Sequence, residues 1–318
     1  MPARVNNGND PVEVPPGQGA ASGGRSVLAL TAYLIVVFLG GALLAPHLWR
    51  AVVMFAPESS LAAAPFHRFV HRSIYFLALV GLWPLLRTLQ VRRWSEIGIA
   101  WLGGSPGELA RGLALGFGSL AVAALVITTG HARIWDGTHT SSEWSHHLIN
   151  AIFAALAAGL LEELLFRGAL FAPFRRQGGF VIAAAVSAFV YALTHFFRPV
   201  HFNGAIEWTS GLTVLGLMCG GFMDWQALVP AFFNLALAGW ALALARERTG
   251  TLWFSIGLHA GWSFWVKSFA FLTRGQPLSD VWIWGSGKLI DGWLAMLVLV
   301  AVIPMVYRLT APRKSIRA

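Results

Sequence analysis

The chain has 318 residues, of which 56% are hydrophobic and only 12% are charged. A soluble domain carries about twice that charged fraction, so the composition excludes a water-soluble globular protein and indicates an integral membrane protein. The net charge of +9 comes from short basic clusters between apolar segments, which is typical of topology control and of contact with anionic lipid, and argues against nucleic acid as a partner.

The predicted elements begin with residues 1–25, which are rich in Pro, Gly, Asn and Ala and predict a disordered cytoplasmic tail. Residues 26–310 form the predicted membrane domain, and residues 311–318 form a basic cytoplasmic tail. We expect an all-α polytopic bundle of about eight spans around a polar intramembrane catalytic cavity. The expected spans lie near residues 26–49, 70–87, 111–131, 148 onward, 179–197, 226–245, 250–270 and 291–308.

The apolar stretch 211–223 is too short to cross the bilayer, and we expect a re-entrant or interfacial segment there. The alternative that it spans would reverse the topology of everything after it. Basic residues are more numerous in the predicted cytoplasmic loops, which favours both termini in the cytoplasm. The Ala-, Gly-, Arg- and Trp-rich composition suggests a bacterial source, hence the bacterial inner membrane.

The fourth predicted span contains Glu162, Glu163 and Arg167. Ionisable residues at membrane depth are costly and therefore mark candidate functional sites. Glu163 and Arg167 are four residues apart, on one helix face, and are expected to form an ion pair. Glu162 points about 100° away from that face, so we expect it to face a polar cavity.

Two later spans supply candidate partners for this glutamate. The fifth predicted span ends with Tyr191 and His195, which lie on one helix face. The seventh contains His259 and Ser263, again on one face. One glutamate and two histidines from three helices are sufficient to activate a water molecule for amide hydrolysis. We therefore expect these groups to converge in the bundle core.

Three motifs in this order resemble the CAAX protease and bacteriocin-processing family of intramembrane glutamic endopeptidases, which includes the type II CAAX prenyl endopeptidase. The family motifs are Glu-Glu-x-x-x-Arg, Phe-x-x-x-His and His-x-x-x-Asn or Asp. Here their positions hold Glu162, Glu163, Arg167, Tyr191, His195, His259 and Ser263. Tyr191 replaces the Phe and Ser263 replaces the Asn or Asp. The resemblance covers roughly residues 148–266, including a lead-in to the third motif at 246–253.

The resemblance implies roles for these residues. Glu162 would be the general base that activates water, supported by the second glutamate and the arginine of its motif. His195 and His259 would hold the water or polarise the scissile carbonyl. Position 263 would help to form the oxyanion hole, where the loss of a donor costs about 2.7–4 kcal/mol. Ser263 therefore implies altered geometry, another donor or reduced activity.

The residues alone leave other functions open. Glu162, His195 and His259 are a possible zinc site with water as fourth ligand, although no His-Glu-x-x-His motif is present; without zinc, no cofactor is expected. An ion-coupled transporter or a non-catalytic immunity or scaffold protein with the same fold are further alternatives. We favour an intramembrane endopeptidase whose partners are membrane lipid and a membrane-associated peptide or protein substrate.

Overall fold

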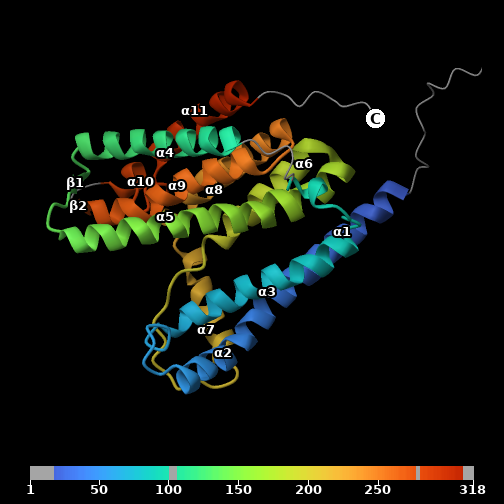
Figure 1. The fold of residues 1–318 in the computed structure, drawn as a ribbon, viewed down its shortest axis with the longest axis horizontal. Helices are drawn as coiled ribbons and strands as arrows, with labels where there is room; N and C mark the ends of the chain where they lie inside the picture. Colours follow the sequence, from blue (N-terminus) through green and yellow to red (C-terminus); the bar gives the residue numbers. More distant parts are fainter. Residues whose placement is uncertain (1–17, 100–105, 277–279, 311–318) are drawn as a thin grey trace, which may run out of the picture.

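The structure is a computed structural model that describes residues 18–99, 106–276 and 280–310. Helices dominate this part of the chain, which confirms the predicted all-α polytopic architecture. Helices α4, α5, α8, α9 and α11 form one bundle, and a second group of α1, α2, α3 and α7 slants away from it (Figure 1). Helix α6 joins the two groups because it packs on both α8 and α1.

In chain order, the helices begin with α1 (Gln18–Ile35), the π-helical turn η1 (Val36–Gly40), α2 (Gly41–Phe55), α3 (Phe66–Thr88), η2 (Trp94–Ile97) and α4 (Pro106–Thr129). They are followed by α5 (Ser141–Glu163), η3 (Leu164–Leu170), α6 (Phe171–Thr194), α7 (Ser210–Met218), η4 (Cys219–Met223), α8 (Trp225–Thr249), α9 (Trp253–Leu272), α10 (Val281–Trp284) and α11 (Trp293–Leu309). Two short strands, β1 (Arg133–Trp135) and β2 (Thr273–Gly275), pair antiparallel with Arg133 opposite Gly275.

Local sequence signals explain where the site-bearing helices begin and end. Thr140 caps α5 by accepting a hydrogen bond from the Glu143 backbone N–H, and the Glu143 carboxylate accepts one from the Thr140 N–H. The Asp224 side chain caps the start of α8. Helix α8 ends at Gly250, whose φ of 71° is the left-handed conformation that favours glycine.

Among the residues that the structure describes, five helical stretches are long and apolar enough to cross a membrane: Val27–Phe55, Phe66–Thr88, Pro106–Thr129, Ser141–Thr194 and Trp225–Thr249. Helix α11 is apolar but has only 17 residues, and α9 is buried over most of its length. The stretch 141–194 contains 54 residues, about twice what one crossing needs. The number of crossings is thus not fixed by helix length alone.

The chain reverses direction inside stretch 141–194. Gly179 has a φ of 79° and a ψ of −179°, outside the helical region. The Ser187 hydroxyl donates a hydrogen bond of 3.0 Å to the Phe166 carbonyl, although 21 residues of straight helix would separate them by about 31 Å. The stretch therefore consists of two helical segments that pack against each other, and these correspond to the fourth and fifth predicted spans.

One predicted boundary differs from the structure. Helix α1 begins at Gln18, so the predicted disordered tail is wrong for residues 18–25, whereas residues 1–17 and 311–318 lie outside the described residues. The stretch 211–223 forms α7 and η4, which together remain too short to cross. Helix α7 packs against α2, where a Cβ on Gly211 would collide with the carbonyl oxygen of Ala42.

Helix α9 is held between α4 and α5. Gly112 and Gly116 of α4 face the backbone of α9, and a Cβ on either would collide with the carbonyl oxygens of Phe254 or Leu258. Small residues spaced in this way allow membrane helices to approach closely. The close packing fixes the position of α9, which carries the third motif.

Candidate active site

Glu162 and Glu163 end α5, and a π-helical turn begins at the next residue, Leu164. Such turns inside longer helices are frequent at functional sites. Both glutamates are buried, and Glu163 is fully enclosed. A carboxylate that is taken out of water must be compensated by partners, and the two glutamates are compensated in different ways.

Glu163 belongs to a buried charged cluster. The guanidinium of Arg167, which is also fully buried, donates from Nη1 to Glu163 Oε1 over 2.9 Å. Its Nη2 donates to the carbonyl oxygen of Gly239 on α8 over 3.1 Å, and it lies over the ring of Tyr191 at 4.6 Å from the centroid. The predicted Glu163–Arg167 contact is therefore present and also ties α5 to α8.

His259 of α9 completes this cluster. Its Nδ1 lies 2.9 Å from the same Oε1 atom of Glu163. An ionised carboxylate only accepts hydrogen bonds, so this contact places a proton on Nδ1 and turns Nε2 toward Glu162. A carboxylate that orients an imidazole in this way selects its tautomer. This contact holds the ring of His259 in one orientation.

Glu162 lies between the two histidines. Its Oε2 atom is 3.6 Å from His259 Nε2 and 3.7 Å from His195 Nε2. His195 is held at the end of α6 because its Nδ1 bonds the Tyr191 carbonyl oxygen over 2.8 Å. Oε2 is buried and accepts no hydrogen bond from the described residues. The arrangement leaves this oxygen available to take a proton from a water molecule.

Tyr75 of α3 reaches the same glutamate from the other helix group. Its hydroxyl lies 3.4 Å from Glu162 Oε1. The sequence analysis did not single out Tyr75, because a lone tyrosine in a hydrophobic span has no spacing that relates it to a motif 87 residues away. A tyrosine in a predicted span was the only available signal.

A cavity of about 170 Å³ adjoins Glu162. Its wall includes both histidines and Ser263, so the four predicted catalytic residues lie around one cavity. Ser263 is half-buried, and no hydrogen bond of its hydroxyl is present among the residues that the structure describes. Asn234 of α8 also contributes to the wall, but its amide N–H groups donate to the carbonyl oxygens of Ile290 and Gly292, both over 2.8 Å. Asn234 therefore offers an acceptor to the cavity and not a donor.

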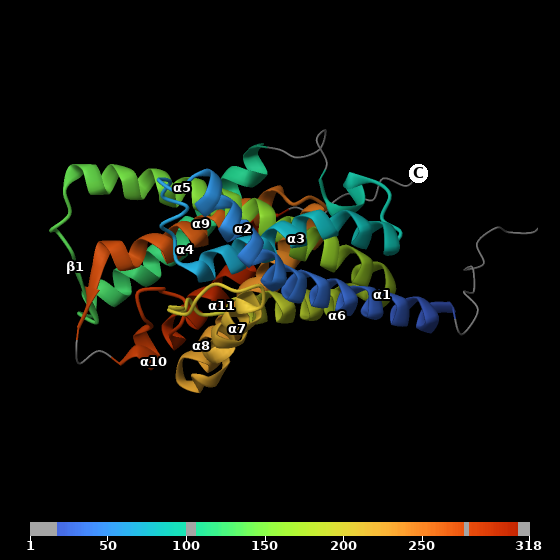
Figure 2. The same ribbon diagram turned by 90° about the horizontal axis from the view of Figure 1, so that it is seen from below.

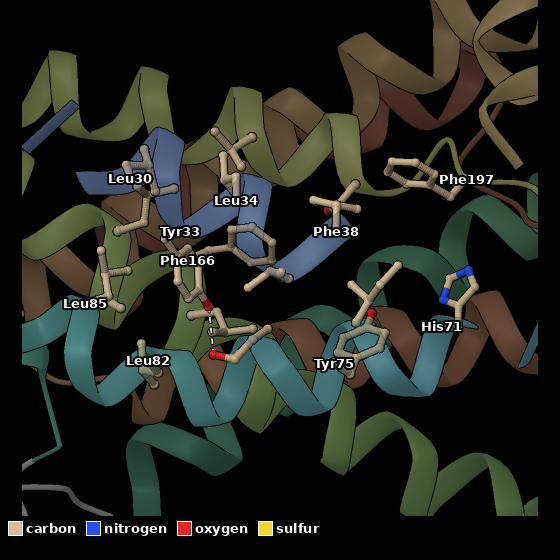
Figure 3. A pocket seen from close by; sticks show the side chains of 18 of the residues that line it. Leu30, Tyr33, Leu34, Phe38, His71, Tyr75, Leu82, Leu85, Phe166 and Phe197 are labelled. Carbon is tan, nitrogen blue, oxygen red and sulfur yellow. Dashed lines mark hydrogen bonds between the residues drawn. The ribbon is translucent and has the colours of Figure 1, made fainter. Parts of the chain in front are cut away.

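A second, apolar cavity lies between α1, α3, η3 and α6 (Figure 3). Tyr33 and Phe166 line it, and the Tyr33 hydroxyl donates to the Ala78 carbonyl over 2.7 Å. Tyr75 belongs to the same wall while its hydroxyl contacts Glu162. Tyr75 thus connects the wall of the apolar cavity to Glu162, which lines the polar cavity.

The metal alternative also concerns these residues. Within the described ranges, no group of three or more His, Cys, Asp or Glu side chains has an arrangement that could hold a metal ion.

Comparison with known proteins identifies the segment that carries the site. Residues 143–265 match the family model described as type II CAAX prenyl endopeptidase Rce1-like. No curated protein matches the chain. The matched segment runs from the start of α5 to the middle of α9 and contains all seven motif positions.

Proposed function

Residues 143–265 match the Rce1-like family model of type II CAAX prenyl endopeptidases, and on this premise we propose that the chain is an intramembrane glutamic endopeptidase. It hydrolyses a peptide bond of a membrane-associated protein or peptide. The observation that carries the proposal is the place of Glu162 Oε2, buried between the Nε2 atoms of His195 and His259.

In the proposed reaction, Glu162 removes a proton from a water molecule, and the resulting hydroxide attacks the scissile carbonyl carbon. The carbonyl oxygen becomes an oxyanion. When His195 and His259 are protonated at Nε2, these N–H groups donate hydrogen bonds that stabilise the oxyanion. Collapse of the tetrahedral intermediate breaks the C–N bond, and the protonated Glu162 returns its proton to the leaving amine. Glu163 keeps His259 in the orientation that this sequence needs.

Ser263 takes the position that the family gives to an asparagine or aspartate. Its hydroxyl lies in the cavity wall and can donate one hydrogen bond, from a shorter side chain than asparagine has. We propose that it contributes weakly to oxyanion stabilisation.

The apolar cavity beside Tyr75 supports a substrate with an apolar portion near the scissile bond. We further propose a bacterial inner-membrane location with both termini in the cytoplasm.

The deciding experiment measures cleavage of membrane-anchored substrates by purified enzyme in liposomes. Glu162→Gln keeps the shape of the side chain but removes the base, and we expect a loss of at least about 10²-fold in rate. Glu207→Gln is the matched control, because Glu207 is exposed and does not line the cavity. Ser263→Asn is expected to increase the rate by supplying a longer donor.

Cleavage measured with and without a chelator distinguishes the glutamic mechanism from the zinc-dependent alternative. We expect cleavage to be unaffected by chelation and no stoichiometric metal in the purified protein. Cleavage that is abolished by chelator and restored by zinc would favour the metal-dependent mechanism. Absence of cleavage by every form, with Glu162→Gln still functional in cells, would leave the transporter and scaffold alternatives.

A further inference from the structure

Lys267 is a charged residue of α9 that the proposed reaction does not use. It follows Ser263 by four residues and His259 by eight, so the three side chains leave one face of the helix. All three line the polar cavity beside Glu162. Lys267 is the exposed member of the three, whereas His259 is buried and Ser263 is half-buried.

The ammonium group of Lys267 has no acidic partner in the part of the chain that the structure describes. No carboxylate oxygen of those residues lies within 4.0 Å of it. Glu162, the acidic residue of the same cavity, faces the two histidines instead. The cavity wall therefore carries one positive charge that the described residues do not neutralise.

A purely structural explanation is that Lys267 extends along the bilayer to a nearby interface. It lies five residues before the end of α9 at Leu272, so the closer interface is at that end. The Cα–Cβ bonds of an α-helix, however, tilt toward its N-terminus, which leads this side chain toward Ser263. Its presence in the cavity wall agrees with that direction.

We propose that Lys267 forms a subsite for an anionic group of the substrate, namely the carboxylate of an acidic side chain or of a free C-terminus. The inference rests on the proposed peptidase function and names the charge that its substrate carries. The neighbouring wall residues Val266 and Leu299 are apolar, so the ammonium group is the charged group that this part of the wall offers, and a charge-assisted hydrogen bond is stronger than one between neutral groups.

The helix geometry limits where this carboxylate lies in the substrate. Eight residues of α-helix rise about 12 Å, which separates the level of Lys267 from that of His259. An extended peptide covers this distance in about four residues at roughly 3.3 Å each. The lysine side chain shortens the gap, so the anionic group lies within about four residues of the scissile bond.

The test compares one membrane-anchored peptide series with a single aspartate placed at each of the four positions on either side of the scissile bond. A neutral parent peptide, and a pair with a free or an amidated C-terminus, complete the series and distinguish the two sources of the carboxylate. Wild-type enzyme is expected to cleave the best anionic peptide with kcat/KM at least tenfold above its neutral counterpart.

Variants assign this preference to Lys267. We expect the ratio to fall to about one in Lys267→Met, to persist in Lys267→Arg, and to reverse in Lys267→Glu in favour of a peptide with lysine at that position. Lys288→Met is the matched control, because Lys288 is exposed and absent from the cavity wall; it should keep the full preference.

The outcomes separate the two proposals. Cleavage by the wild type without any preference for anionic peptides, or a preference that survives in Lys267→Met, would overturn the subsite and leave the peptidase intact. A series in which the wild type cleaves no peptide at all, while folded by size-exclusion chromatography, would overturn the peptidase and the subsite with it.

Discussion

At the scale of single residues, the centre of the site is a buried charged cluster. Arg167 is fully enclosed and bonds both Glu163 and the Gly239 carbonyl. Glu163 in turn bonds His259. Removing one partner of a buried ion pair leaves an uncompensated charge, which is far more costly than the net contribution of the pair. The cluster therefore links stability to the orientation of a proposed catalytic histidine.

This linkage predicts that Arg167→Met lowers the stability of the protein by roughly 3–5 kcal/mol. Arg167→Lys should recover only part of the loss, because one ammonium cannot reproduce the planar fork that contacts both Glu163 and Gly239. Thermal unfolding in detergent measures the effect, and Arg308→Met, on the exposed end of α11, is the control. An Arg167→Met protein as stable as the wild type would contradict the role of the cluster.

At the scale of elements, the close packing of α4 and α9 decides where His259 lies. A Cβ on Gly257 of α9 would collide with the carbonyl oxygen of Leu109, and one on Gly261 would clash with the backbone of Phe117. Glycines on both helices thus allow backbone-to-backbone contact. Any side chain at these positions must push α9 away from α4.

We therefore expect Gly257→Val to displace α9 and to reduce peptidase activity at least tenfold, together with a lower unfolding temperature. Gly118→Ala is the matched control. Gly118 lies on α4, the helix that packs against Gly257, but a Cβ at position 118 meets nothing within 4 Å. Gly118→Ala should be neutral, because alanine is also the better helix former. Equal activity and stability of the two variants would show that the close approach does not matter.

At the scale of the whole molecule, a strand pair closes one end of the bundle, at the opposite end from the start of α1 (Figure 2). Asp136 follows β1, and the Arg274 side chain of β2 donates to its carboxylate over 2.6 Å. This hydrogen bond, with a further one from Thr138, holds the pKa of Asp136 well below its usual value. The contact ties the α4–α5 connection to the end of α9.

The pH dependence follows from the direction of that shift. A carboxyl group whose pKa is lower in the folded state contributes stability above its unfolded pKa of about 3.9, and loses it progressively as the pH falls further. The stability difference between wild type and Asp136→Asn should therefore be constant near neutral pH and begin to shrink below about pH 4. Thermal unfolding across this range measures it; a difference that grows on acidification would contradict the assignment.

The sequence by itself determined the membrane class, the helical architecture and the residues of three motifs. Charge depletion and helical spacing are local properties, and they require no knowledge of which helices are neighbours. The Glu163–Arg167 pair was predictable for the same reason, because four-residue spacing places both side chains on one helix face.

The tertiary structure alone decided the rest. The Tyr75 hydroxyl contacts Glu162 from a helix that is far away in the sequence, and Glu163 contacts His259, which lies 96 residues later. Position 257 needs a glycine because the backbone of α4 leaves no room for a Cβ there. The reversal of the chain at Gly179 brings His195 beside Glu162. None of these contacts has a sequence period, because each depends on which helices pack together and how closely their backbones approach.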